Sequence, residues 1–191
     1  MRTILIVGSD KISANALAKI QVSGDLYIFI DRSTTIKRVI RLIRKRVISP
    51  ILILRMFLCE QLRSRVATTV VNQSLKSNQD LLDVIKDLSP DRVVLFRAGL
   101  ILNREIISSG PQILNIHAAS VPQYGGIGSI YRALRKGAFE QSASLHVVTE
   151  EIDRGEVLDE ERYVLIPGLG YCANERIAYE AATNLLIRTL K

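Results

Sequence analysis

The sequence predicts an α/β fold with a Rossmann-like, doubly wound and mostly parallel sheet, in a single domain over residues 1–191. Three observations predict it. Short apolar runs alternate with amphipathic stretches of helical period, as repeated strand–helix–strand units require. The first run is followed by a glycine turn, which is typical of the opening of such a unit. The run at residues 91–96 is largely apolar, as expected of a central parallel strand that is buried on both faces.

Strands and helices are expected to alternate along the first half of the chain. We predict strands at Thr3–Val7, Leu26–Ile30, Val66–Val71 and Asp91–Phe96. A helix follows the first strand, with Ile12, Ala16, Leu17 and Ile20 at helical spacing. Another helix, over Asn78–Leu88, carries its apolar residues on one face and ends before Pro90. Connections of this kind build a parallel sheet.

The second half of the chain continues with strands and helices of its own. We predict strands at Ile113–His117, Ser144–Thr149 and Val157–Leu165, and helices at Ile127–Lys136 and from Tyr171 onward. The last helix carries an apolar stripe along one face. Glu175 lies in its first turn, where an acidic side chain ordinarily stabilises a helix. Contact between Glu175 and a substrate is the alternative.

A basic helical segment at about residues 35–65 interrupts the alternation of strands and helices. Its nine lysine and arginine residues are accompanied by a single acid, Glu60, and Pro50 separates a first helix from a second. Two interpretations are open. The helices could pack on the sheet with a solvated basic face, or they could form a surface for an anionic lipid interface or a large phosphorylated acceptor. Aromatic side chains are scarce here, which argues against stacking on single-stranded nucleic acid.

The composition is that of a folded chain with a basic surface. Hydrophobic residues make up 48% and charged residues 24% of the chain, which excludes a disordered protein. The net charge of +7 favours anionic partners such as phosphates, nucleotides or a membrane surface, and we expect no nucleic acid partner. Cys59 and Cys172 lack any motif spacing and are expected to be buried thiols in a reducing compartment. Neither a signal peptide nor a membrane span is predicted, so we expect a cytoplasmic protein. The oligomeric state is not indicated.

Residues 112–158 contain the side chains best suited to chemistry. The apolar run Ile113–His117 predicts a buried strand, on which Asn115 and His117 lie two residues apart and so on the same face. An amide and an imidazole at the end of a strand, followed by a loop rich in proline and glycine, are poor core material and good material for a ligand site. A later strand ends in the acidic turn Glu150–Gly155.

The motifs N-I-H, P-Q-Y-x-G, L-H-V-V and I-D-x-G-E-V-L in this region resemble those of the folate-dependent formyltransferases. That family includes glycinamide ribonucleotide, methionyl-tRNA and amino-sugar formyltransferases. The resemblance is dense over residues 90–160 and thinner over residues 2–31. It implies the formyltransferase variant of the Rossmann-like fold, N10-formyltetrahydrofolate as the co-substrate, a primary amine as the acceptor, and no metal.

The resemblance also implies a catalytic triad of Asn115, His117 and Asp153. Formyl transfer to an amine passes through a tetrahedral species whose oxygen is negatively charged, and an Asn amide and an imidazolium can both donate to that oxygen. The imidazole can also take the proton that the attacking amine loses, and a nearby carboxylate favours the charged imidazolium. His146 has a counterpart in the family, but its apolar neighbours favour a structural histidine. The loop after His117 lacks the proline and serine that are usual in the family, so we expect it to be less rigid.

Binding segments follow from the same resemblance. Leu100, Ile101 and Leu102 match the segment that contacts the pteridine ring of the folate, and Thr149, Glu150, Glu151 and Ile152 match the second segment that contacts it. Gly8, Ser9 and Lys11 match a turn that binds a substrate phosphate through backbone N–H groups and a positive charge. A plain turn between strand and helix is the alternative.

The expected acceptor is an amino sugar, nucleotide- or lipid-linked and therefore phosphorylated. The chain ends shortly after the predicted core, so we expect none of the C-terminal domain with which methionyl-tRNA formyltransferases hold tRNA. Two other functions stay open. Hydrolysis of formyltetrahydrofolate would use the same triad with water as the acceptor, although enzymes of that type carry an N-terminal regulatory domain. A non-catalytic relative that binds folate or an anionic surface is the other, and the intact triad argues against it.

Overall fold

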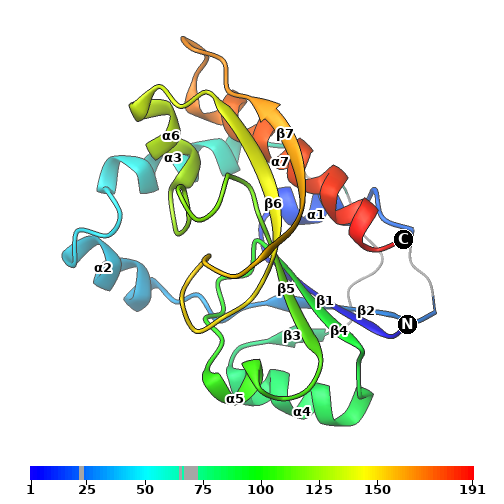
Figure 1. Ribbon diagram of the computed structural model, residues 1–191. Coiled ribbons are helices and arrows are strands. Elements are labelled where there is room, and N and C mark those ends of the chain that lie inside the picture. Colours follow the sequence, from blue (N-terminus) through cyan, green and yellow to red (C-terminus); the bar gives the residue numbers. More distant parts are fainter. Residues whose placement is uncertain (22–23, 65, 67–72) are drawn as a thin grey trace.

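The computed structural model describes residues 1–21, 24–64, 66 and 73–191 (Figure 1). Its strands are β1 (Thr3–Gly8), β2 (Leu26–Asp31), β3 (Gln73–Leu75), β4 (Arg92–Phe96), β5 (Gln112–His117), β6 (Glu140–Val147) and β7 (Val157–Val164). Its helices are α1 (Lys11–Leu17), α2 (Ile36–Arg44), α3 (Pro50–Leu62), α4 (Asn78–Leu88), α5 (Arg104–Ile107), α6 (Ser129–Lys136) and α7 (Tyr171–Thr189).

The described strands form one twisted sheet in the order β3-β2-β1-β4-β5-β6-β7. The strands from β3 to β5 pair in parallel, and β6 and β7 add an antiparallel edge after β5. Consecutive side chains of β1 point to opposite faces, and both sets are buried. The predicted α/β, doubly wound and mostly parallel architecture is confirmed.

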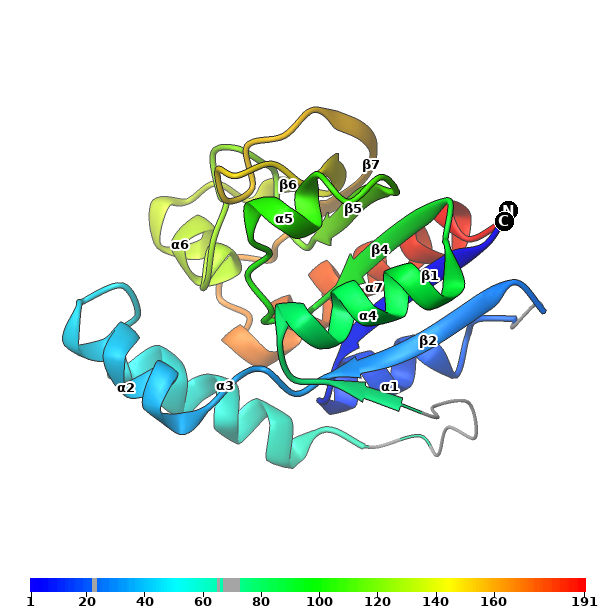
Figure 2. The same cartoon turned by 90° about the horizontal axis from the view of Figure 1, so that it is seen from below.

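Helices cover both faces of the sheet, so each face has its own apolar core (Figure 2). Leu5 and Val7 pack with residues of α1 and α7 on one face. Ile4 and Ile6 pack with residues of α4 and α5 on the other. Because both faces are closed, a ligand must approach the sheet at the ends of its strands. The carboxyl ends are the usual ligand-binding edge of such sheets.

Several predicted elements end at different residues in the structure. Helix α4 has the predicted bounds, but α1 ends at Leu17 and the short α5 was not predicted. Strand β6 covers Glu140–Val147, so it begins four residues before the predicted strand. Near its start, Gln141 and Ser142 are polar yet buried and bond with Ser120, and polar residues give no apolar pattern. Apart from Val66, the predicted strand at Val66–Val71 lies outside the described residues.

The basic segment forms α2 and α3, as predicted, and the two helices lie at one side of the sheet (Figure 1). Of the thirteen residues of α3, Leu52 and Cys59 are buried, and α2 buries none. The interpretation in which both helices pack on the sheet is therefore only partly confirmed. Within the described residues, no helix is long and apolar enough to cross a membrane.

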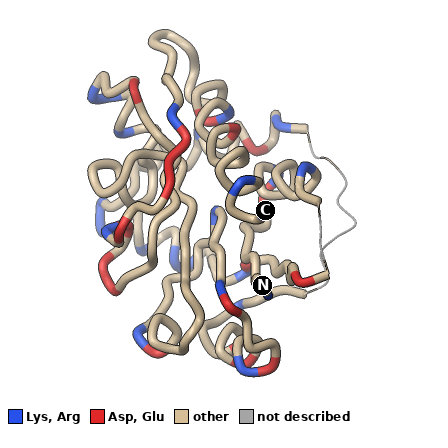
Figure 3. The backbone as a smooth tube through the Cα atoms, turned by 45° about the vertical axis from the view of Figure 1, so that its right-hand side comes forward, with Lys and Arg blue, Asp and Glu red and all other residues tan. Residues whose placement is uncertain are grey.

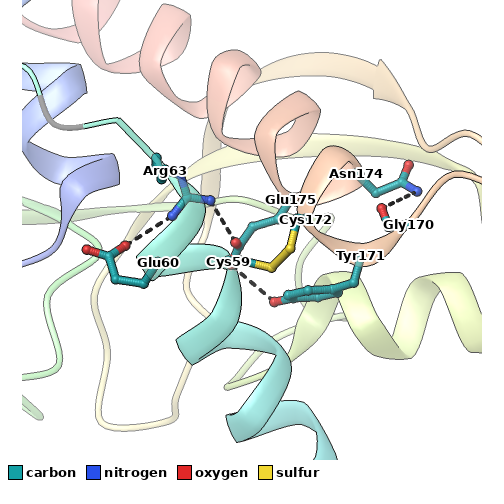
Figure 4. Close-up of a disulfide and its surroundings, with 8 residues drawn as sticks. All are labelled: Cys59, Glu60, Arg63, Gly170, Tyr171, Cys172, Asn174 and Glu175. Atoms are coloured by element: carbon teal, nitrogen blue, oxygen red, sulfur yellow. Dashed lines mark hydrogen bonds and ion pairs between the residues drawn. A yellow bond between two sulfur atoms is a disulfide. The ribbon is translucent and has the colours of Figure 1, made fainter.

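A disulfide joins Cys59 of α3 to Cys172 in the first turn of α7 (Figure 4). The expectation of two free buried thiols is therefore wrong. The two cysteines are 113 residues apart, so their spacing could not indicate the pairing. Beside the disulfide, Arg63 bridges Glu60 of α3 and Glu175 of α7, at 3.1 and 2.9 Å. Glu175 also accepts a hydrogen bond from the Tyr171 hydroxyl, so this carboxylate is structural here.

Candidate active site

The structure brings Asn115, His117 and Asp153 together at the carboxyl end of β5. Asn115 and His117 project from one side of this strand, and Asp153 reaches them from the turn after β6. The Asn115 amide Nδ2 donates to Asp153 Oδ1 at 3.3 Å, and His117 Nδ1 lies 3.5 Å from Asp153 Oδ2. Side chains separated by 38 residues in the sequence thus form one polar cluster, as the motifs predict.

Asp153 is held in place by the loop before α6. Its Oδ2 accepts the Gly126 N–H at 2.6 Å, and the Arg132 guanidinium donates to the carbonyls of Gly125 and Ile127. A Cβ on Gly125 would lie only 2.9 Å from the Cβ of Asp153, so the close approach of these two segments requires glycine. The P-Q-Y-x-G motif therefore helps to position the carboxylate of Asp153, which belongs to a distant motif.

The spacing I-D-x-G also has a steric reason. Gly155 lies against the carbonyl oxygen of Val147 so closely that a side chain there would overlap that oxygen. The Val147 N–H donates to the carbonyl of Glu156 at 2.9 Å, which closes the turn. Asp153 itself has φ of 52°, in the left-handed region that Asp tolerates better than most residues. This tight turn directs the carboxylate back toward β5.

His146 is a fourth member of the cluster, which the sequence analysis treated as structural. It pairs directly across from Asn115 in the antiparallel β5–β6 ladder, and its side chain is 2% exposed. Its Nδ1 donates to the Val147 carbonyl at 2.9 Å, so Nε2 accepts from Asn115 Nδ2 at 3.1 Å. Nε2 also lies 3.4 Å from Asp153 Oδ1. His146 lies in the L-H-V-V motif, but its contact with Asn115 depends on the pairing of residues 115 and 146 between two strands, which the motif does not show.

Burial and neighbouring groups shift the pKa values of His117 and Asp153. Burial lowers the pKa of His117 and outweighs the neighbouring Asp153 carboxylate, which raises it. Burial therefore favours the neutral imidazole of His117 over the imidazolium that the nearby carboxylate was expected to favour. Burial alone would raise the pKa of Asp153, but the adjacent rings of His146 and His117 and the Gly126 N–H lower it to about 2. A neutral imidazole beside a carboxylate can accept a proton and form a stabilised ion pair.

The pKa of His117 can be tested by NMR, because the chain has two histidines. We expect the His117 ring to titrate below its ordinary value of 6.5. In Asp153→Asn its pKa is expected to fall further, because the carboxylate that favours the imidazolium is gone. A His146→Gln variant assigns the two signals. A His117 pKa above 6.5, or one that Asp153→Asn raises, would contradict this account of the site.

The two segments predicted to bind the folate lie beside each other. Arg104, which begins α5 just after Leu102, pairs with Glu150 of the turn after β6 at 3.3 Å. Ile101 is 56% and Ile152 62% exposed, so both segments present an apolar side chain to solvent. Asp31, at the end of β2, accepts the N–H groups of Gly99 and Leu100 and fixes the first segment. Sequence reasoning did not find this role of Asp31.

The turn predicted to bind a phosphate lies at the same edge of the sheet, two strands away from β5. The spacing of strands puts it about 10 Å from the triad. The Lys11 N–H donates to Glu60 at 2.8 Å and its ammonium to the Gln61 carbonyl at 3.2 Å, so α3 covers this turn. Asp10 caps α1 through the Ser13 N–H and pairs with Arg97 at 2.5 Å. These protein groups occupy positions that a phosphate would use, and its binding there stays a prediction.

The loop after His117 is firmly anchored, contrary to the expectation of a less rigid loop. The Tyr163 hydroxyl donates to the Ala118 carbonyl at 2.6 Å, and Ser120 Oγ lies 3.1 Å from Ser142 Oγ. Ala118 and Ala119 are buried, so small side chains here fit the core. His117 Nε2 donates to the Tyr124 carbonyl at 3.0 Å, which fixes the ring.

Comparison with known proteins agrees with this geometry. The family model described as formyl transferase matches residues 40–190, most of the chain. The chain belongs to the formyl transferase family. A methionyl-tRNA formyltransferase from Sulfurihydrogenibium sp. is 35% identical over 86 residues, which are 44% of this chain and 28% of that relative. The chain matches less than two thirds of the length of such curated relatives.

Several solved structures share the fold of this chain. A phosphoribosylglycinamide formyltransferase from Anaplasma phagocytophilum superposes with a TM-score of 0.69 at 15% identity, over 100% of this chain and 84% of that one. A candidate sugar N-formyltransferase from Mycobacterium tuberculosis superposes with a TM-score of 0.66 at 14% identity, over 100% of this chain and 66% of that one.

Within the described residues of this chain, no group of three or more His, Cys, Asp or Glu side chains is placed to hold a metal ion.

Proposed function

We propose that this formyl transferase moves the formyl group of N10-formyltetrahydrofolate to a primary amine, with an amino sugar as the acceptor. The observation that carries the proposal is that Asn115, His117 and Asp153 lie together. The Asp153 carboxylate is 3.3 Å from Asn115 Nδ2 and 3.5 Å from His117 Nδ1. The co-substrate would lie with its pteridine ring between Leu100–Leu102 and Thr149–Ile152. The pairing of Arg104 with Glu150, which brings these segments together, supports that position.

In the proposed reaction the amine nitrogen attacks the formyl carbon, and the carbonyl oxygen gains the negative charge. In the structure, one amide hydrogen of Asn115 points at His146 and the other at Asp153. The hydrogen bond to Asp153 is the longer, at 3.3 Å, and in the reaction Asn115 gives up this bond to donate to the oxyanion. The neutral His117 accepts the amine proton at Nδ1, which faces Asp153. Collapse of the tetrahedral species breaks the bond to N10 of the folate and releases the N-formyl amine, and N10 takes up the proton that His117 accepted, which restores the neutral ring.

The choice of acceptor rests on the basic surface and the family. The net charge of +7 favours a phosphorylated molecule such as a nucleotide- or lipid-linked amino sugar. A candidate sugar N-formyltransferase of the same fold supports this choice. Cytoplasmic location is part of the proposal, because N10-formyltetrahydrofolate must be supplied to the site.

The test is a screen of amines with a donor that carries a 13C-labelled formyl group. Amino sugars linked to nucleoside diphosphates or to polyprenyl phosphates are incubated with protein and donor, with glycinamide ribonucleotide and methionyl-tRNA as alternative acceptors. Mass spectrometry is expected to find the label in an N-formyl sugar. Label released only as formate would instead indicate hydrolysis, and label on neither would contradict catalysis by this chain.

A further inference from the structure

The α2–α3 segment exposes an unusually large apolar surface. Five large apolar side chains lie on one side of α3, each 48% to 82% exposed: Ile51, Leu54, Phe57, Leu58 and Leu62. They recur at intervals of three and four residues, so they form one continuous face that points away from the buried Leu52 and Cys59. Scattered exposed apolar residues are ordinary, but a continuous apolar face on a folded domain marks an interaction site.

Positive charge is concentrated in the same segment of the chain. On α2, exposed Ile36 and Ile40 lie beside exposed Lys37, Arg41 and Arg44. Residues 36–62 contain seven of the 26 basic residues but one of the 19 acidic residues, so they supply +6 of the net charge of +7. Acidic residues gather elsewhere, for example in the run Asp159, Glu160 and Glu161 of β7 (Figure 3). The excess charge of the protein is thus concentrated on α2 and on the loop that joins it to α3, next in sequence to the apolar face.

We propose that the exposed sides of α2 and α3, the docking face, bind the surface of an anionic lipid bilayer. Apolar side chains of α3 would enter the boundary between headgroups and acyl chains, while the lysines and arginines of α2 contact lipid phosphates. Long basic side chains can lie along apolar surface with their charges among the headgroups. A second copy of this chain is a poorer occupant, because two copies of residues 36–62, each with a charge of +6, repel each other.

The docking face is built next to the active site. Arg38 of α2 donates to the Gly99 carbonyl at 2.6 Å, directly before Leu100–Leu102. On α3, Leu52 touches Gly128 at the start of α6, and the Arg55 guanidinium lies 5.5 Å from the centre of the Tyr131 ring. A bilayer bound to α2 and α3 would therefore lie beside the loops that hold the triad. If the proposed function holds, this position suits an amine carried by a membrane lipid.

Flotation with lipid vesicles tests the docking without folate or acceptor. We expect wild type to float with vesicles of phosphatidylcholine that contain about 30% phosphatidylglycerol and to float poorly with phosphatidylcholine alone. Binding is expected to weaken in high salt. Two variants address the two parts of the face: Leu54→Ser/Phe57→Ser and Lys37→Glu/Arg41→Glu. Each should lower the vesicle affinity at least about tenfold.

Matched controls carry the same changes elsewhere on the surface. Val164→Ser/Ile166→Ser removes equally exposed apolar side chains, and Lys86→Glu/Arg176→Glu makes the same change of charge. Both controls are expected to bind vesicles as wild type does. Failure of folded wild type to bind anionic vesicles would overturn the proposal, as would equal losses in variants and controls. A dimer in solution that Leu54→Ser/Phe57→Ser dissociates would also overturn it and assign the face to a second copy.

Discussion

Replacing Asp153 by Asn is expected to reduce the rate of formyl transfer by about 10³-fold, because it removes the charge at the centre of the site. The carboxylate contacts Asn115, His117 and His146 and is fixed by the Gly126 N–H. Asn has the same shape, so the loop and strands should stay in place. Without the negative charge, however, the protonated His117 that forms when the amine attacks loses its partner.

The kinetic constants separate a catalytic effect from a structural one. The rate is measured with the acceptor found in the labelling screen, and the loss should fall on kcat with little change in KM for the donor. Asp159→Asn is the matched control, since Asp159 is a partly exposed carboxylate of β7 that pairs with Arg188 of α7, away from the triad. An Asp153→Asn enzyme that retained more than about a tenth of the wild-type kcat would show that the carboxylate does not act on the reaction.

Replacing Cys172 by Ser is expected to lower the free energy of unfolding by about 2–4 kcal/mol, the largest stability effect that we predict. The disulfide closes a chain segment of 113 residues, and its loss frees the unfolded chain to adopt many more conformations. Cys59 is buried, so the thiol left behind stays in the core. Urea denaturation measures the change.

Wild type treated with a reductant is the companion measurement. It should lose as much stability as Cys172→Ser, because both break the same link. We also expect faster hydrogen exchange in α3, which is held to α7 by the disulfide and by the Arg63–Glu175 ion pair (Figure 4). Equal stability of oxidised and reduced wild type would show that the pairing contributes nothing to the fold.

The fold was predictable from the sequence because apolar periodicity reports strands and helices that are buried. Strand β5 and helix α4 have clear patterns and were found at or near their bounds. The predicted start of strand β6 lies too far along the chain, because the true start of the strand is polar. Ser142 and Ser144 are nevertheless buried, through hydrogen bonds with Glu160. Such residues look like loop in a sequence, since their partners come from another strand.

Only some features of the candidate site could likewise be predicted from the sequence. Asn115, His117 and Asp153 were found because each lies in a short motif, and motifs preserve spacing along the chain. His146 also lies in a motif, L-H-V-V, but its contact with Asn115 crosses the sheet, as does the contact of Asp31 with the Gly99–Leu100 backbone. Local sequence carries no record of such contacts. The neutral state of His117 also depends on burial, which only the folded chain defines.

The most direct measurement is isothermal titration of the protein with a stable analogue of 10-formyltetrahydrofolate. It tests the donor site whichever amine is the acceptor. The proposed site predicts binding of one analogue per chain with micromolar affinity, weakened at least about tenfold by Ile101→Asp, which puts a charge into the proposed pteridine contact. Absence of binding by folded wild type would contradict formyl transfer from this folate and leave the lipid-docking face to be tested alone.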